Sequence, residues 1–266
     1  MLTVKLMEGL GDCLVAAAAI EEYGWQKAVK VRYITNPVLA PLFENHHVIE
    51  FAEDGPADVN LKWASTLRRE DGIDVFPLHC INRFASQLGI YADPTKTLTV
   101  WDAKGNQIVN EPLSRDQKRH VCINIYSKDK TRRFVPQRFV DMLCGDCAAA
   151  EIDVKFIGEC ERSDQVTDVN EMIELLKTAT GFMGPVSFPY HLACVFDVSC
   201  LTFFSFMPAW KFSDFTNTSV MQGYRKCVAR CEQWEEQSRK EQDCLGGCKV
   251  DYDDYQFRDL LEGAFM

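Results

Sequence analysis

The sequence lacks the long apolar segments of membrane-spanning and secreted proteins. It contains no run of about 18 or more apolar residues, the length that a transmembrane helix needs. Its first residues do not form the basic segment, apolar core and small-residue cleavage site of a signal peptide. We therefore expect a cytoplasmic protein without a membrane span, whose twelve cysteines are reduced or bind metal.

Positive charge is also scarce. The chain has 29 Lys and Arg against 39 Asp and Glu, a net charge of −10. Proteins that coat nucleic acid neutralise phosphates with Lys and Arg, so this balance argues against that class. One local exception is the window 115–138, which holds eight Lys or Arg against Asp116 and Asp129. Within an acidic protein, this window indicates a phosphate-binding segment or a solvated basic loop.

What is present is a regular alternation of strand-like and helix-like segments, which is typical of parallel sheets. The 266 residues suffice for two domains of about 100 to 150 residues each. Strands are expected at 2–6, 29–34, 48–51, 58–61, 73–76, 120–126, 153–157, 180–183 and 199–204. Helices are expected at 13–24, 37–45, 79–90, 136–150, 170–178 and 189–196.

The polar stretch 103–119 carries Gly and Pro and is the expected linker. It separates an N-terminal α/β domain (1–110) from a C-terminal one (119–216). The remainder, 217–266, is charged and rich in cysteine, and we expect a helical tail there. Its last helix, expected at 254–262, would cross back to the first domain.

Two glycine-punctuated turns, each leading from a strand into a helix, carry the functional signal. The first is Gly9-Leu10-Gly11-Asp12, and the second runs from Gly184 to Ala193 with the sequence GPVSFPYHLA. Helix N-termini present free N–H groups and partial positive charge, which suit them to phosphate. We interpret the two turns as the faces of one cleft that holds a nucleotide-linked substrate.

Together with the segment Lys128–Phe139 (KDKTRRFVPQRF), these turns resemble motifs of the heptosyltransferase-like glycosyltransferases of family 9. The three motifs occur in the family's order over about the first 206 residues, in a short and divergent form. The resemblance implies the GT-B fold, in which two Rossmann-like domains face each other across a central cleft. The first domain would face the acceptor, and the second would bind a nucleotide sugar.

The resemblance further implies an inverting glycosyltransferase that needs no catalytic metal. Such a reaction requires a base for the acceptor hydroxyl, and cations or N–H dipoles for the departing diphosphate. Asp12 resembles the family's base. Its structural alternative is to cap a helix that starts at Cys13, a role that aspartate fills well.

The remaining expected donor-binding residues flank the same cleft. Arg132 and Arg133 in the basic window, with Gly11, Ser187 and His191 at the two turns, would contact the diphosphate. Glu159 or Glu161 follows the strand 153–157, where a carboxylate would bind the nucleotide ribose. The alternative for His191 is a purely structural histidine, and the alternative for Glu159 is an exposed polar turn. Val186 and Phe188 stand where the family carries Asp and Gly, which leaves the identity of the donor open.

The tail contains two C-x₃-C pairs, Cys227 with Cys231 and Cys244 with Cys248. On helices, each pair projects to one side, so four thiolates can surround one ion. Zinc is the expected structural metal and iron the alternative. A disulfide-linked hairpin and plain reduced cysteines remain open. We interpret Cys144 and Cys147, another closely spaced pair, as packing residues.

The resemblance implies that the acceptor is a saccharide hydroxyl, as is usual in the family, or a hydroxymethylated base in phage-type DNA. Two other classes of function remain open on the same fold. A nucleotide-sugar epimerase or hydrolase would consume the donor without an acceptor. A non-catalytic nucleotide-sugar-binding module would bind the donor and not consume it.

Overall fold

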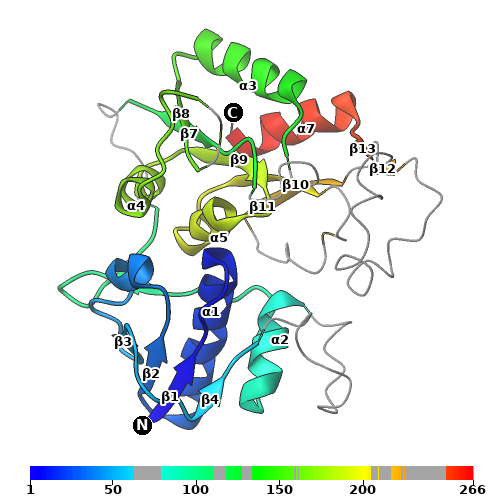
Figure 1. Ribbon diagram of the computed structural model, residues 1–266. Helices are drawn as coiled ribbons and strands as arrows, with labels where there is room; N and C mark the ends of the chain where they lie inside the picture. The colour runs from blue at the N-terminus through cyan, green and yellow to red at the C-terminus, as the bar shows by residue number, and fades with distance from the viewer. Residues whose placement is uncertain are drawn as a thin grey trace.

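The computed structural model describes residues 1–62, 79–110, 118–127, 134–158, 160, 162–204, 209, 217–222, 224–225 and 250–265. They form two α/β lobes, the first drawn in blue to cyan and the second in green to red in Figure 1. Each lobe is built on a parallel sheet with helices packed against it. The predicted strand at 73–76 lies outside the described residues.

The first sheet has four parallel strands in the order β3-β2-β1-β4, close to the predicted ranges. They are β1 (Leu2–Lys5), β2 (Val31–Ile34), β3 (Ile49–Ala52) and β4 (Val59–Asn60). Helix α1 (Leu10–Lys27) packs on this sheet, and the small side chains of residues 16–19, all alanine, let it approach closely. Helix α2 (Cys80–Ala85) packs beside α1.

Two predicted helices of the first lobe are shorter than expected. The segment predicted at 37–45 is a 3-10 helix, η1 (Pro37–Leu42), whose start is capped by the Asn36 side chain. Pro41 inside it has no N–H to donate, so a regular α-helix cannot continue through this segment. The helix predicted at 79–90 divides into α2 and the 3-10 turn η4 (Ser86–Leu88).

The second sheet has five parallel strands in the order β11-β10-β9-β7-β8. Its strands are β7 (His120–Ile123), β8 (Asp153–Phe156), β9 (Gly181–Pro185), β10 (Cys200–Phe204) and β11 (Thr218–Gln222). Helices α3 (Gln137–Ala149) and α7 (Asp254–Phe265) cover one face, while α4 (Val169–Lys177) and α5 (Phe188–Val195) face the first lobe (Figure 1).

The tail differs from its expected form. Thr218–Gln222 was expected to be helical but is an edge strand, because β10 offers it a parallel partner along its whole length. Strands β12 (Tyr224–Arg225) and β13 (Val250–Asp251) then form a short antiparallel pair. Helix α7 is confirmed but does not cross back, since Phe257 packs on Phe139 with ring centroids 4.4 Å apart.

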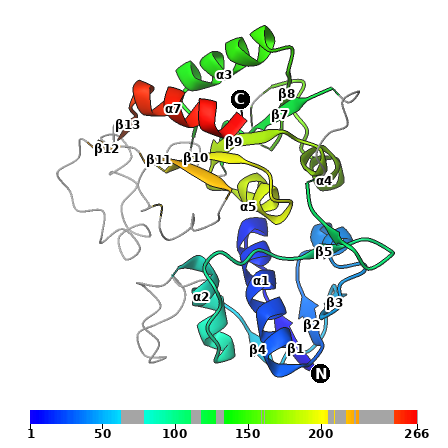
Figure 2. The same ribbon diagram turned by 180° about the vertical axis from the view of Figure 1, so that it is seen from behind.

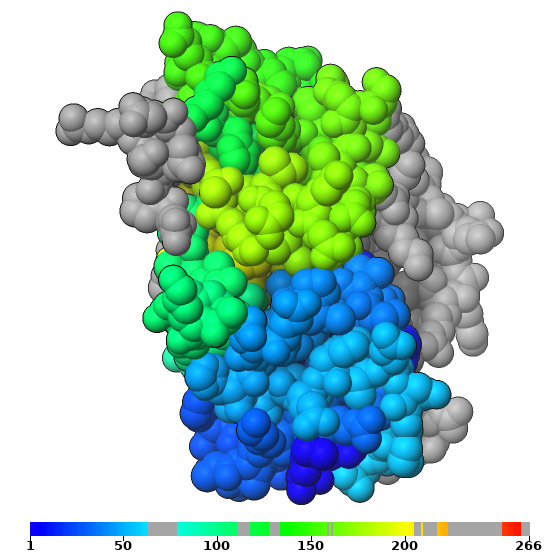
Figure 3. All heavy atoms as spheres, turned by 90° about the vertical axis from the view of Figure 1, so that its left-hand side faces the viewer, coloured from blue at the N-terminus to red at the C-terminus, as the bar shows by residue number. Residues whose placement is uncertain are grey.

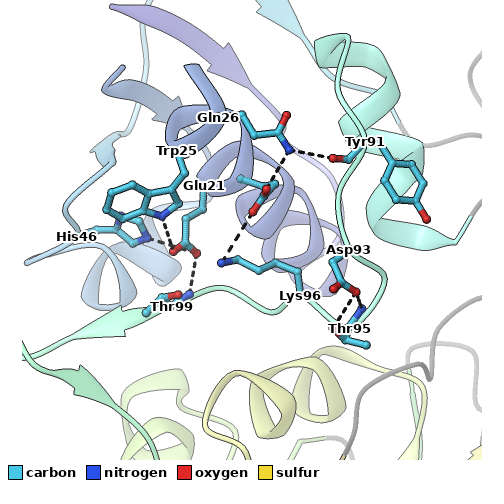
Figure 4. Close-up of polar contacts among 10 residues, drawn as sticks. Glu21, Trp25, Gln26, His46, Tyr91, Asp93, Thr95, Lys96 and Thr99 are labelled. Atoms are coloured by element: carbon cyan, nitrogen blue, oxygen red, sulfur yellow. Dashed lines mark hydrogen bonds and ion pairs between the residues drawn. The ribbon is translucent and has the colours of Figure 1, made fainter. Parts of the chain in front are cut away.

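The two lobes are joined by a connector that is fixed at both ends. The Thr99 amide donates to the buried Glu21 carboxylate of α1 at 2.8 Å, as Figure 4 shows. At the other end, Asn110 Nδ2 donates to the carbonyls of Leu176 and Ala179 at 3.2 and 2.7 Å. Between these anchors lies a hairpin of β5 (Val100–Trp101) and β6 (Gln107–Ile108), which includes the start of the expected linker 103–119. Residues 111–117 of that linker lie outside the described residues.

The lobes also touch directly. Figures 1 and 2 place α5 above the first turn of α1, and the buried residues of both helices belong to one hydrophobic cluster. Figure 3 shows the blue and the yellow-green parts in contact along one face. Among the described helices, none combines the length and apolar character that crossing a bilayer requires.

Candidate functional site

The two glycine turns come together at the junction of the lobes. Helix α1 begins at Leu10 and α5 begins at Phe188, so Gly11 and His191 both lie in or next to a first helical turn. A Cβ built on Gly11 would stand 3.0 Å from His191 Cδ2 and 3.6 Å from the Phe188 backbone. The absence of a side chain at Gly11 therefore lets the two helix N-termini lie in contact.

Asp12 occupies the third position of α1 and is half-buried. The predicted alternative, an N-cap of a helix starting at Cys13, is wrong, because the helix starts at Leu10 and its N-cap is Gly9. A carboxylate in the first turn is stabilised by the positive end of the helix dipole. A Cβ on Gly9 would lie 3.1 Å from Asp12 Oδ2, so glycine leaves room beside this carboxylate.

Ser187 is the N-cap residue of α5, but its hydroxyl does not cap the helix. Ser187 Oγ donates to the Pro185 carbonyl at 3.0 Å and accepts a hydrogen bond from Asn124 Nδ2 at 2.8 Å. The proton of the Ser187 hydroxyl is therefore donated to the Pro185 carbonyl of the same turn. Any contribution of this turn to an anion comes through the first-turn amides of α5, which have no intrahelical acceptor.

Asn124 is a site residue that the sequence analysis missed. Its side chain is 1% exposed and follows β7 at the carboxyl end of the strand. A Cβ on Gly158, whose φ is +71°, would lie 3.1 Å from Asn124 Oδ1 and 3.0 Å from Pro189 Cγ. Asn124 and Gly158 thus pack against the start of α5, at Ser187 and Pro189. The available signal was a polar residue directly after the apolar run Val121–Ile123.

His191 is buried at the junction, with 8% of its surface exposed. It lines a cavity of about 20 Å³ between α1 and α5, together with Leu14 and Val15. Its ring lies 5.1 Å from that of Tyr190, whose pKa burial raises well above the ordinary value. The structure therefore places Gly11 against His191, with Asp12 and Ser187 in the same two turns, and the binding and catalytic roles of these four residues stay predictions.

The other predicted site residues lie outside the described residues: Arg132, Arg133, Glu159, Glu161, Cys227, Cys231, Cys244 and Cys248. The ends of the basic segment are described, and they adjoin the site. Tyr126 and Phe134 form an antiparallel bridge, and the Val135 amide donates to the Ile125 carbonyl at 2.9 Å. The described residues on either side of 128–133 are therefore paired with each other next to Asn124.

A metal centre is not formed by the described part of the chain, where no three His, Cys, Asp or Glu side chains gather. The cysteines there are free and mostly buried. Burial raises the pKa of the Cys80 and Cys122 thiols to about 12, which keeps them protonated near neutral pH.

Comparison with known proteins identifies the fold. No family model matches the sequence, and no curated protein matches it. Among solved structures, the iron-containing dodecameric glycosyltransferase TibC from enterotoxigenic E. coli superposes with a TM-score of 0.68 at 13% identity, covering 99% of this chain and 76% of that one. The family 9 glycosyltransferase from Veillonella parvula gives 0.59 at 12% identity, covering 91% and 89%.

The ADP-heptose lipopolysaccharide heptosyltransferase II of E. coli gives a TM-score of 0.60 at 7% identity, covering 86% of this chain and 92% of that one. The chain therefore has the fold of the heptosyltransferases and family 9 glycosyltransferases. This result confirms the predicted α/β class and the resemblance drawn from the three motifs. At these identities, the likeness defines the fold, and the activity has to be argued from the site.

Proposed function

We propose that the protein is a glycosyltransferase that moves a sugar from a nucleotide diphosphate to an acceptor hydroxyl. The observation that carries the proposal is the contact between two helix N-termini at Gly11 and His191, with the Asp12 carboxylate in the first turn of one of them. One terminus offers amides to a diphosphate, and the other offers a base. The fold shared with heptosyltransferases supports the same conclusion.

In the proposed reaction, Asp12 takes the proton of the acceptor hydroxyl as its oxygen attacks the anomeric carbon. The bond from that carbon to the diphosphate breaks on the opposite side, so the configuration inverts. The amides of α5, with His191, Arg132 and Arg133, stabilise the charge on the leaving diphosphate. Gly11 allows the close approach of the two turns, and Glu159 binds the ribose. No metal takes part in this scheme.

Two solved neighbours support an ADP-linked donor. One structure of TibC is described in complex with ADP-D-β-D-heptose, and the E. coli heptosyltransferase WaaC is described with ADP. We therefore propose an ADP-linked sugar as the first donor to test. For the acceptor we propose a saccharide, and binding to duplex DNA that weakens steeply with salt would favour the modified base instead.

The test compares Asp12→Asn with Glu8→Gln in donor consumption with and without acceptor. Glu8 is an exposed carboxylate just before the same turn, so it controls for the loss of one charge. Removal of a general base is expected to lower the rate about 100-fold or more, while the control stays near the wild-type rate. Equal rates for both variants would contradict the role of Asp12.

A non-catalytic binding module is the second candidate, and one observation favours it. The Ser187 hydroxyl is engaged by Asn124 and Pro185, and Val186 is buried in the turn. This module would bind an ADP-sugar without consuming it under any acceptor condition. An epimerase or hydrolase would consume the donor with no acceptor present, so the same assay separates the three classes.

For the tail we propose a structural metal held by Cys227, Cys231, Cys244 and Cys248. Four thiolates suit zinc or iron in a tetrahedron, and the neighbour TibC is named as iron-containing. Elemental analysis of the purified protein should give about one equivalent of metal per chain, and the Cys244→Ser variant should lose most of it. Full retention of metal in that variant would contradict the site.

A further inference from the structure

A cavity of about 220 Å³ lies between the lobes, apart from the α1–α5 junction. One wall comes from η1 and the residues after it, a second from the β5–β6 hairpin, and a third from α4. In Figures 1 and 2, α4 lies directly above η1, so both lobes and their connector contribute to this cavity. It shares no lining residue with the cavity beside His191.

An indole forms part of the cavity wall. Trp101 of β5 lies against the His47 ring at a centroid distance of 4.1 Å, and its own side chain is half-buried. The Trp101 Nε1 atom is buried and has no hydrogen-bond partner among the described residues. Leu42 and Ile173 add apolar surface next to the indole.

The charges around the cavity disfavour an anion. Three carboxylates line it, those of Glu44, Asp102 and Glu174, against the ammonium group of Lys177. Lys177 Nζ lies 2.7 Å from Glu174 Oε1, so its charge is already compensated. A phosphate here would meet net negative charge, which opposes binding.

A divalent cation is also disfavoured, because the carboxylate oxygens have partners. Asp102 Oδ1 accepts hydrogen bonds from the amides of Lys104 and Asn106, each at 2.8 Å. Glu174 is paired with Lys177, so Glu44 is the remaining lining carboxylate that could coordinate a cation. The amides of Asn45 and Asn170 remain on two of the walls, and each can both donate and accept.

We infer that this cavity is a second ligand site, for a neutral polyhydroxylated molecule of one or two sugar rings. Hydroxyl groups satisfy amides and carboxylates alike, and the indole provides an apolar face. The volume is below the roughly 300–1,000 Å³ of drug-sized pockets, so a nucleotide sugar does not fit. The inference rests on this cavity alone and does not require the proposed transferase activity.

A ligand in this cavity would also affect how the two lobes are placed relative to each other. The hairpin that forms one wall is fixed to α1 at Thr99 and to the second lobe at Asn110. A ligand that contacts η1, the hairpin and α4 together binds best in one relative placement of the lobes. Its binding therefore favours that placement.

The experiment uses the full-length protein and saturation-transfer NMR with glucose, mannose and maltose, with glucose 6-phosphate and Mg²⁺ as charged probes. At least one neutral sugar should bind, and the phosphorylated sugar should bind more weakly. Asn170→Trp, at an exposed position of α4, fills the cavity and should abolish the signal. Trp101→Ala removes the apolar face of the indole and should weaken binding up to about tenfold.

Lys104→Ala, at the exposed tip of the hairpin, is the control and should leave sugar binding unchanged. Saturating ADP should not displace the sugar, which separates this site from the proposed donor site. The inference is overturned if no neutral sugar binds, if Asn170→Trp binds as the wild type does, or if Mg²⁺ or the phosphate is preferred. A lack of transferase activity would overturn the proposed function only.

Discussion

Gly11 of α1 and His191 of α5 touch across the junction of the lobes, with only 3.0 Å between the position of a Gly11 Cβ and His191 Cδ2. A methyl group there requires the imidazole to move by a few tenths of an ångström. The two residues come from different lobes, so their contact fixes how closely the helix N-termini approach. It also makes their effects on stability dependent on each other.

The first prediction concerns the Gly11→Ala substitution. Alanine favours a helix over glycine by about 1 kcal/mol, but in the wild type this gain is offset by crowding against His191. In the His191→Ala background the crowding is removed, so Gly11→Ala should raise the free energy of unfolding by about 1 kcal/mol. Denaturant unfolding of the four proteins of this cycle measures the coupling, which should exceed about 0.5 kcal/mol. Additive effects would mean that the two residues do not touch.

The second prediction concerns Asn124, which holds Ser187 at 2.8 Å while 1% exposed. Asn124→Ala leaves Ser187 Oγ without its donor and should lower the free energy of unfolding by about 1–3 kcal/mol. Ser187→Ala removes the other partner, and the double variant should cost less than the sum of the two. An Asn106→Ala variant in the exposed hairpin is the control for loss of an asparagine side chain. Strict additivity of the two substitutions would contradict the hydrogen bond.

The third prediction compares two helical glycines. A Cβ on Gly24 of α1 would collide with Val48 Cγ1 and lie 2.9 Å from the Val29 carbonyl oxygen, whereas a Cβ on Gly145 of α3 would meet nothing within 4 Å. Gly24→Ala should therefore destabilise the protein by about 1–3 kcal/mol through overpacking. Gly145→Ala should stabilise it by about 0.5–1 kcal/mol. Thermal unfolding of both variants measures this opposite sign, and a shared sign would contradict the packing of α1.

Much of the fold followed from the sequence because it depends on local patterns. Apolar runs such as Val121–Ile123 predicted buried strands, and the paired glycine turns predicted a helix after each turn, although the first helix begins at Leu10 and not at the predicted Cys13. Thr218–Gln222 could not be predicted in this way, because its strand state depends on pairing with β10. The role of Asn124 was missed for the same reason, since Ser187 is distant in the sequence and close only in the fold.

The last prediction concerns pH and the Glu21 carboxylate, which anchors the connector (Figure 4). Burial raises the pKa of Glu21, but the nearby His46 ring and the Thr99 amide together lower it by more than burial raises it. The pKa of Glu21 therefore lies below its ordinary value of 4.5. His46 Nε2 is 3.8 Å from Glu21 Oε2, and Trp25 Nε1 donates to Oε1 at 3.3 Å. All these contacts favour the ionised form.

A depressed pKa in the folded state means that the stabilisation is present above the unfolded-state pKa and is lost as pH falls through the folded-state value. Glu21→Gln keeps the shape but removes the charge, and should cost about 1–3 kcal/mol at neutral pH. The deficit relative to the wild type should shrink as the pH falls below 4.5, because Glu21 of the unfolded wild-type chain is protonated there before Glu21 of the folded protein is. Urea unfolding of both proteins between about pH 3 and 7 measures this difference. Glu53→Gln, at an exposed position just after β3, is the control for the loss of one carboxylate and should cost little stability. A Glu21→Gln deficit that stays constant down to pH 3 would show that the charge of Glu21 does not stabilise the connector.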